Sequence, residues 1–294
     1  MGARLAVNPI SYWLTPTGMD RSTANLAIAM RELSEIGYTY VKADVPTDMQ
    51  PDQYLNWLDG FGMKPATTLF SASFVDRSQH DAVAEQAKAF AKVQASLGLR
   101  YTMISTMDGM QAPRMTTPAI GFQHDPEQFE AVVDGMRLAC QAMQSEGVTA
   151  ALHSHIGGAV ETDAEIREVL DSINADLLKF GPDTGHMAWG GVDVAQIIGD
   201  YADRIVATHL KDVFISKAEQ GKRDNKAYFD MNTRGALWAE PGVGELDFDS
   251  IIAAFPKAFD GDFMIEVDVP SVESKRESHQ ISFEWAQRAL PIGG

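Results

Sequence analysis

The chain has 294 residues, 45% hydrophobic and 22% charged, the balance of an ordinary globular protein. Its 24 basic and 41 acidic residues give a formal net charge of −17, which argues against nucleic acid and anionic membranes as partners. The single cysteine, Cys140, excludes an intramolecular disulfide. The sequence contains no run of about 18 apolar residues, so we expect no transmembrane helix. Because the N-terminal residues predict a first strand rather than a signal peptide, we expect a cytoplasmic protein.

Short apolar segments alternate with longer amphipathic ones along the chain. The apolar segments are continuous, as in parallel strands covered on both faces: 4–8, 39–44, 64–70, 101–105, 149–154, 177–182, 205–211 and 263–268. Helical spacing of apolar residues marks 22–36, 79–97, 125–146, 162–173, 192–201, 247–255 and 274–289. This alternation predicts a (β/α)₈ TIM barrel that forms a single domain over 1–294. The alternative is a doubly wound open sheet, but no GxGxxG follows the first strand.

The longest irregular segment is 214–245, between the seventh and eighth strands. It carries Phe229, Arg234 and Trp238, and in a barrel it would lie on the catalytic face. We expect it to close over the site and exclude water, with Gly242 and Gly244 as a hinge. An oligomer contact is a compatible alternative.

Carboxylates and imidazoles gather at the ends of the last four strands. They are His153 and His155 with Glu161 in the following loop, Asp183 with His186, His209, and Glu266 with Asp268; Lys211 follows His209 by two residues. Singly, each has a structural explanation, such as an Asp that caps a helix or a Glu that faces a helix N-terminus. Their coincidence at four successive strand ends predicts a metal site, because catalytic residues of barrels lie there. Mixed Asp, Glu and His ligation suits Mn²⁺, Co²⁺, Fe²⁺ or Zn²⁺ rather than Ca²⁺.

Several motifs resemble those of the xylose-isomerase-like sugar isomerase/epimerase superfamily: HSHIGGAVET, DTGHMAWGG, THLKD, PGVGELDF and FMIEVD. The most similar are those of inosose (2-keto-myo-inositol) dehydratases and related keto-sugar lyases, from about residue 148 to 270. NPISYW at 8–13 is similar to the first strand of the dehydratases. The resemblance implies a TIM barrel that binds one divalent metal, and we expect Mn²⁺ ahead of Co²⁺, Fe²⁺ or Zn²⁺. The apurinic endonuclease branch of the superfamily grips DNA, which the charge of this chain disfavours.

The ligand set that the resemblance implies is a carboxylate from strand five, then Asp183, His209 and Glu266. Strand five departs from the commoner pattern, because His153 stands where a Glu is usual. Either His153 binds the metal, or Glu161 folds back from the loop to do so. We favour Glu161, since a carboxylate restores the charge balance.

Proton transfer and substrate contacts complete the expected site. His153 or His155 is expected to move a proton. Lys211 points to the same side of its strand as His209 and would bind a substrate oxygen or act as an acid, with an ion pair to Asp183 or Glu266 as the alternative. We expect the substrate to contact Asn8, Trp13, His186 and Trp238. Lys42 stands near a position where many relatives carry Glu, which leaves the exact substrate open.

This chemistry favours a metal-dependent carbon–oxygen lyase that acts on a keto-polyol or keto-sugar, such as inosose or a 3-keto-glycoside. A metal that chelates a ketone and its neighbouring hydroxyl lowers the cost of an enediolate, and several nearby histidines can serve the leaving oxygen. A sugar isomerase or epimerase with the same metal site is the alternative, and a non-catalytic sugar-binding barrel is a third. The expected partner is a small keto-sugar or inosose, and a homo-oligomer is possible.

Overall fold

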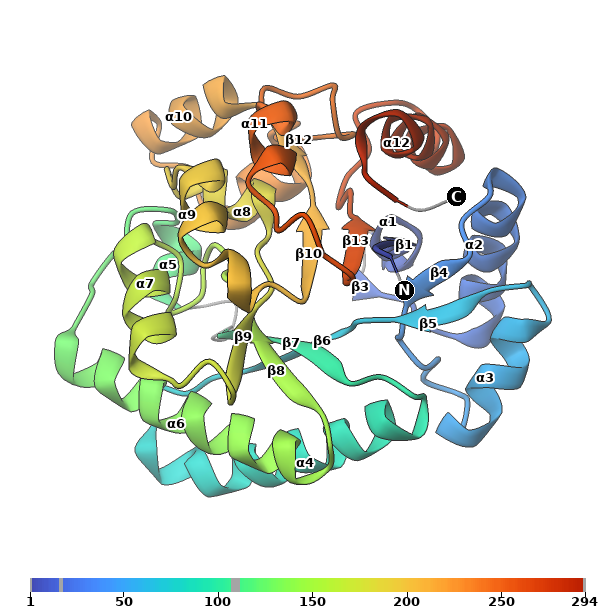
Figure 1. Ribbon diagram of the computed structural model, residues 1–294. Helices are drawn as coiled ribbons and strands as arrows, with labels where there is room; N and C mark the ends of the chain where they lie inside the picture. Colours follow the sequence, from blue (N-terminus) through green and yellow to red (C-terminus); the bar gives the residue numbers. More distant parts are fainter. Residues whose placement is uncertain (1, 16–17, 107–111, 293–294) are drawn as a thin grey trace.

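The structure, a computed structural model, describes residues 2–15, 18–106 and 112–292. Parallel strands form a barrel, and helices surround it on the outside (Figure 1). The barrel strands are β1 (Arg4–Val7), β4 (Tyr40–Lys42), β5 (Lys64–Ala66), β6 (Leu69–Ala72), β7 (Tyr101–Thr106), β8 (Thr149–Leu152), β9 (Leu178–Phe180), β10 (Ala207–Leu210) and β13 (Asp262–Ile265). The predicted (β/α)₈ TIM barrel is confirmed.

The strands pair in the orders β10-β13-β1-β4-β5 and β6-β7-β8-β9. One predicted strand, 64–70, is divided into β5 and β6, because Thr67 turns its N–H and hydroxyl to Asp262 Oδ2 at 2.9 and 2.7 Å. β9 and β10 are joined by the bridges Phe180↔Ile205 and Asp183↔His209. The second bridge sets two candidate metal ligands on neighbouring backbones.

The seven predicted helices are present: α2 (Thr23–Ile36), α4 (His80–Ser96), α6 (Pro126–Ser145), α7 (Asp163–Ser172), α9 (Val194–Asp200), α11 (Phe248–Ala253) and α12 (Lys275–Ala289). Their ends follow the expected capping rules. The Ser22 side chain accepts the Asn25 N–H, Asp125 caps α6 ahead of its proline, and Thr162 forms a capping box with Glu165.

Other elements were not predicted. They include α1 (Ile10–Trp13), α3 (Pro51–Asp59), α5 (Pro113–Thr116) and α8 (Thr184–Trp189), the antiparallel strands β2 (Leu14–Thr15) and β3 (Gly18–Met19), and the short 3₁₀ helices η1 (Arg77–Gln79) and η2 (Ala202–Arg204). In α3 only Tyr54 and Leu58 are buried, and one such pair gives too weak a periodicity to detect. None of the described helices is long and apolar enough to span a membrane.

Segment 214–245 is not irregular, contrary to expectation. It forms α10 (Ile215–Arg223), a π-helical turn η3 (Asp230–Arg234) and β12 (Trp238–Ala239), which pairs with β11 (Asp212–Val213). The Asp212 carboxylate accepts N–H bonds from Gly242 and Gly244 at 2.9 Å. A Cβ on Gly244 would lie 2.3 Å from Asp212 Oδ1, so this glycine permits a close contact. The structure thus gives the two glycines a packing role against Asp212, and their role as a hinge stays a prediction.

A buried histidine in α12 predicts an acid-sensitive fold. His279 is fully buried, its Nε2 lies 3.1 Å from Ser11 Oγ, and burial lowers its pKa to about 4. Its unfolded value is near 6.5, so below that pH the unfolded state binds the proton first and the free energy of unfolding falls. Between pH 7 and pH 5 the titration of His279 alone should lower the free energy of unfolding by roughly 2 kcal/mol. Denaturant unfolding of wild type and His279→Phe at both pH values should show a smaller loss in the variant, and equal losses would contradict this expectation.

Candidate metal centre and active site

Asp183 follows β9 and opens α8. Its Oδ1 accepts a hydrogen bond from the His186 backbone N–H at 2.8 Å, so Asp183 caps the helix. This is the structural explanation that the sequence analysis offered for an Asp at a strand end. Its other oxygen, Oδ2, is buried and has no hydrogen-bond partner among the described residues. Capping therefore leaves one carboxylate oxygen available. An ionised oxygen in this condition has a lone pair that a metal ion can take up.

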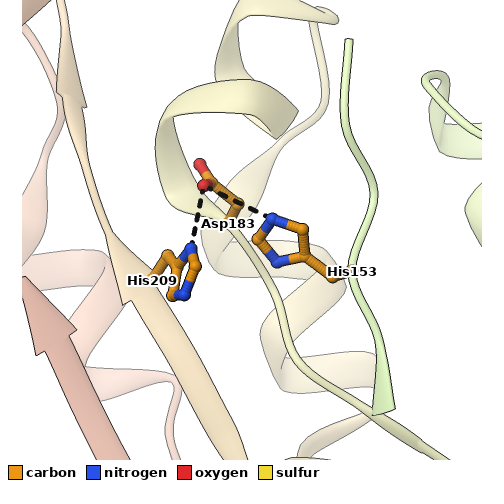
Figure 2. A group of neighbouring side chains, drawn as sticks. All are labelled: His153, Asp183 and His209. Carbon is orange, nitrogen blue, oxygen red and sulfur yellow. Dashed lines mark ion pairs between the residues drawn. The ribbon is translucent and has the colours of Figure 1, made fainter. Parts of the chain in front are cut away.

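Two histidines face that oxygen (Figure 2). His153, just after β8, places Nε2 3.8 Å from Asp183 Oδ2, and His209, on β10, places Nδ1 3.6 Å from it. One ligand atom from each of the three buried residues lies within 4.8 Å of the others. A carboxylate between two imidazoles is a donor set that fits a divalent transition metal.

His153 has the orientation of a metal ligand. Its Nδ1 lies 3.2 Å from the Gly181 carbonyl oxygen, which we assign as an Nδ1–H donor, so the Nε2 lone pair faces Asp183. Burial lowers the pKa of His153 to about 3, which keeps the imidazole neutral at pH 7. Metal-binding histidines commonly donate their second ring N–H to a backbone carbonyl in this way.

Glu266 adjoins the three-residue group. Its Oε2 lies 2.8 Å from His209 Nδ1, and its Oε1 accepts a hydrogen bond from Asn8 Nδ2. Burial opposes ionisation of Glu266, but His209 and Lys211 hold its pKa well below the usual range. Burial likewise opposes the charged form of His209, yet Glu266 and Asp183 raise the pKa of that imidazole to about 9. Glu266 is thus an ionised carboxylate beside the group, where a fourth ligand could approach.

Lys211 is buried among three carboxylates. Its Nζ lies 2.8 Å from Glu266 Oε2, 3.1 Å from Asp268 Oδ1 and 3.5 Å from Asp183 Oδ2. Burial disfavours the ammonium, but these carboxylates raise the pKa of Lys211 well above its ordinary value. The ion pairs considered for Lys211 are therefore present. Asp268 is a third carboxylate that pairs with Lys211, and the sequence analysis gave it no role. Its spacing of two residues from Glu266 places both side chains on the same side of the strand, which is the pattern that could have identified it.

His155 and His186 form a second imidazole pair, with ring centroids 3.8 Å apart. Burial lowers the pKa of His155 to about 4 and that of His186 well below its usual value, so both are neutral at pH 7. His155 Nδ1 lies 2.7 Å from the Ile156 carbonyl oxygen, and we assign it as the donor. The lone pair on His155 Nε2 is then available to accept a proton. His186 Nε2 lies 3.3 Å from Lys211 Nζ, which connects this pair to the carboxylates.

The expected aromatic contacts are buried. Trp238 is 1% exposed, its ring centre lies 4.9 Å from Lys211 Nζ, and its Nε1 donates to Asn232 Oδ1. Trp13 is also buried, 5.4 Å from the guanidinium of Arg21. Trp238 thus packs against the ammonium of Lys211, so segment 214–245 contributes a side chain to this site. Direct contact of Trp13 or Trp238 with a substrate stays a prediction.

Glu161 is not part of the three-residue group. Its carboxylate accepts backbone N–H bonds from Gly157 at 2.8 Å, Gly121 at 2.9 Å and Ala119 at 3.2 Å. Burial raises the pKa of Glu161 despite these bonds. Its side chain thus ties the loop after β8 to the segment that follows β7. Charge balance favours Glu161 as the metal ligand from strand five. The backbone contacts of Glu161 favour His153 instead.

We therefore expect Glu161→Gln to reduce stability and leave metal binding intact. The amide keeps the shape but offers only one acceptor oxygen for three N–H donors, so the loss should be about 1–3 kcal/mol. Denaturant unfolding and elemental analysis of the same preparation measure both quantities. Loss of metal from this variant, with His153→Gln still loaded, would restore Glu161 as the ligand.

Comparisons with known proteins relate this sequence to TIM barrels of known family. The family model described as xylose isomerase-like TIM barrel matches residues 30–289. An inosose dehydratase of Geobacillus kaustophilus (strain HTA426) is 28% identical over 256 residues, which are 85% of this chain and 82% of the relative. The rhizopine catabolism protein MocC of Rhizobium meliloti is 24% identical over 289 residues, covering 96% and 86%.

Solved structures show the same fold. The IOLI protein with a binding zinc atom has a TM-score of 0.71 at 17% identity, covering 98% of this chain and 100% of that one. A D-allulose 3-epimerase from Methylomonas sp. in complex with D-allulose has a TM-score of 0.71 at 15% identity, covering 98% of each chain. Identities this low establish the fold alone. Since the family model spans most of its length, the chain belongs to the xylose isomerase-like TIM barrel family.

Proposed function

We propose that the protein is a metal-dependent carbon–oxygen lyase that removes water from a keto-polyol, with inosose as the first candidate. The observation that carries this proposal is the placement of a metal-binding group beside a neutral histidine pair and a buried ammonium, all at the same end of the barrel. The similarity to an inosose dehydratase over 85% of the chain supports the reaction type. The one cysteine, Cys140, is buried and unpaired, which suits the cytoplasm.

We propose His153, Asp183, His209 and Glu266 as the metal ligands, with His153 in place of Glu161. The available oxygen of Asp183 and the outward lone pair of His153 support this set. Imidazole nitrogens and carboxylate oxygens bind Mn²⁺, Co²⁺, Fe²⁺ and Zn²⁺, and we propose Mn²⁺ as the native metal. A metal bound here would polarise the carbonyl of the substrate.

The protein's own groups would then carry the protons. His155 Nε2 takes the proton from the carbon next to the carbonyl, because its Nδ1–H is committed to Ile156. The resulting imidazolium returns this proton to the hydroxyl on the next carbon, whose C–O bond breaks as the C=C bond forms and water leaves. Lys211, held by Glu266 and Asp268, stabilises the negative charge that develops on substrate oxygens. One histidine thus balances the elimination without an additional reactant.

Product masses test this proposal. The metal-loaded protein is incubated with 2-keto-myo-inositol and, separately, with a 3-keto-glucoside, and the products are analysed by mass spectrometry. A product lighter by one water from the keto-inositol supports the dehydratase, and release of an aglycone identifies a keto-glycoside lyase. Conversion at unchanged mass would instead establish the isomerase or epimerase, which shares the same first proton transfer. No conversion of either substrate would favour a sugar-binding barrel.

A further inference from the structure

A second polar group lies at the same end of the barrel, on strands away from the metal centre. Ala6, Ala66 and Met264 form a small apolar cluster with Tyr40 packed against it, and the cluster includes no residue of the surrounding helices. These four residues come from β1, β5, β13 and β4, which are neighbours in the sheet. The cluster therefore identifies the inward-facing positions of these strands.

The next inward positions lie two residues further along, because side chains alternate across a strand. On β1 and β13 these are Asn8 and Glu266, which are hydrogen-bonded to each other at the metal centre. On β4 the corresponding residue is Lys42, which is 6% exposed. Lys42 thus faces the same end of the barrel as Glu266, one strand beyond Asn8.

Lys42 is fixed by a carboxylate from its own strand end. Its Nζ donates to Asp44 Oδ1 at 2.9 Å and to Oδ2 at 2.7 Å, and Thr68 Oγ1 donates to Asp44 Oδ1 at 3.2 Å. The side chains of Lys42 and Asp44 are only 7% and 9% exposed. Burying two charges carries a desolvation cost that their attraction does not always repay, so stability alone is a weak reason for this pair.

The pair has hydrogen-bonding capacity left over. An ammonium has three N–H donors, and among the described residues Lys42 donates two of them to Asp44, while Asp44 Oδ2 accepts one hydrogen bond and keeps a lone pair. One donor and one acceptor side by side match a hydroxyl group, which both accepts and donates. Since the charges of the pair cancel, it suits an uncharged ligand better than a phosphate or carboxylate.

We propose that Lys42 and Asp44 form a specificity site that recognises one ring hydroxyl of a neutral polyol, remote from the carbonyl at the metal centre. This inference rests on the proposed function for its substrate class, and it adds the residues that select among polyols. A substrate lacking the matching hydroxyl would leave the buried donor and acceptor unpaired. We expect that loss to lower kcat/KM by about 10- to 100-fold.

The test compares 2-keto-myo-inositol with its singly deoxygenated analogues in wild type and in the double variant Lys42→Met/Asp44→Asn. Replacing both partners avoids an unpaired buried charge, and melting temperature and metal content check that the variant folds. The matched control is Lys88→Met/Glu146→Gln, which removes an exposed pair between α4 and the end of α6. A merely structural loss would lower kcat/KM for all substrates equally, so the ratio between substrate and analogue is the decisive quantity.

We expect one deoxygenated position to be rejected 10- to 100-fold by wild type and by the control, and by less than about threefold in the double variant. Equal ratios in wild type and double variant, with turnover intact, would overturn this inference and leave the dehydratase standing. If wild type turns over no keto-inositol, calorimetric binding of myo-inositol decides. If wild type binds myo-inositol and the double variant does not, the hydroxyl site is supported and only the proposed dehydration is refuted. If wild type does not bind myo-inositol, the hydroxyl site and the dehydration are both refuted.

Discussion

Asp183→Ala should lose both bound metal and activity. The substitution removes the only carboxylate oxygen that faces His153 and His209 together within the three-residue group. Because a metal supplies several kcal/mol of transition-state stabilisation, we expect kcat/KM to fall on the order of 10³-fold. Elemental analysis and steady-state kinetics on one preparation measure both effects.

Asp183 also caps α8, so the loss of a cap needs a control. Asp193 caps α9 in the same way, accepting the Gln196 N–H at 3.0 Å, and it lies on the surface. Asp193→Ala should cost about 1 kcal/mol of stability and leave metal and activity unchanged. Asp183→Asn keeps an oxygen for the cap and should still lose metal. Full metal content in Asp183→Ala would show that the group in Figure 2 is not the metal centre.

His155→Gln should lower kcat by about 10²- to 10⁴-fold while the metal content stays normal. The reason is geometric: Nδ1 is committed to the Ile156 carbonyl, so Nε2 is the atom left to move the proton. Glutamine retains a hydrogen-bonding side chain but cannot take up a proton. Rapid-quench or steady-state kinetics beside elemental analysis separate the two effects.

The control for this variant is His124→Gln, at a partly exposed histidine that pairs with Glu165 away from the metal group. Its rate should match wild type. An unchanged rate in His155→Gln would remove His155 from the mechanism. Loss of metal from that variant would make His155 a ligand and require a new assignment of His153.

The fold, and the gathering of candidate ligands at one end of it, can be predicted from the sequence because barrel geometry is repetitive. Continuous apolar segments give the strands, and a shared strand direction brings Asp183, His209 and Glu266 to one end. These residues lie on strands or within three residues of a strand end, so their placement depends mainly on the direction of the strands and on the alternation of side chains.

The role of Glu161 could not be predicted in the same way. Its partners Ala119 and Gly121 lie about 40 residues earlier in the chain, so only the folded loops bring them together. The loop that carries it also requires Gly158, where a Cβ would sit 1.8 Å from the Thr106 carbonyl oxygen. Segment 214–245 was misjudged for a similar reason, since pairing with β11 and packing on Lys211 stabilise its short elements.

Removing the metal and restoring it shows whether the protein needs a bound ion for its chemistry. The protein is stripped with a chelator until elemental analysis finds no divalent metal, and it is then titrated with Mn²⁺ in the presence of 2-keto-myo-inositol. We predict no product in the stripped protein, and recovery of a product lighter by one water that saturates at one Mn²⁺ per chain. Dehydration at the full rate by the metal-free protein would show that this group of histidines and carboxylates does not work through a bound metal.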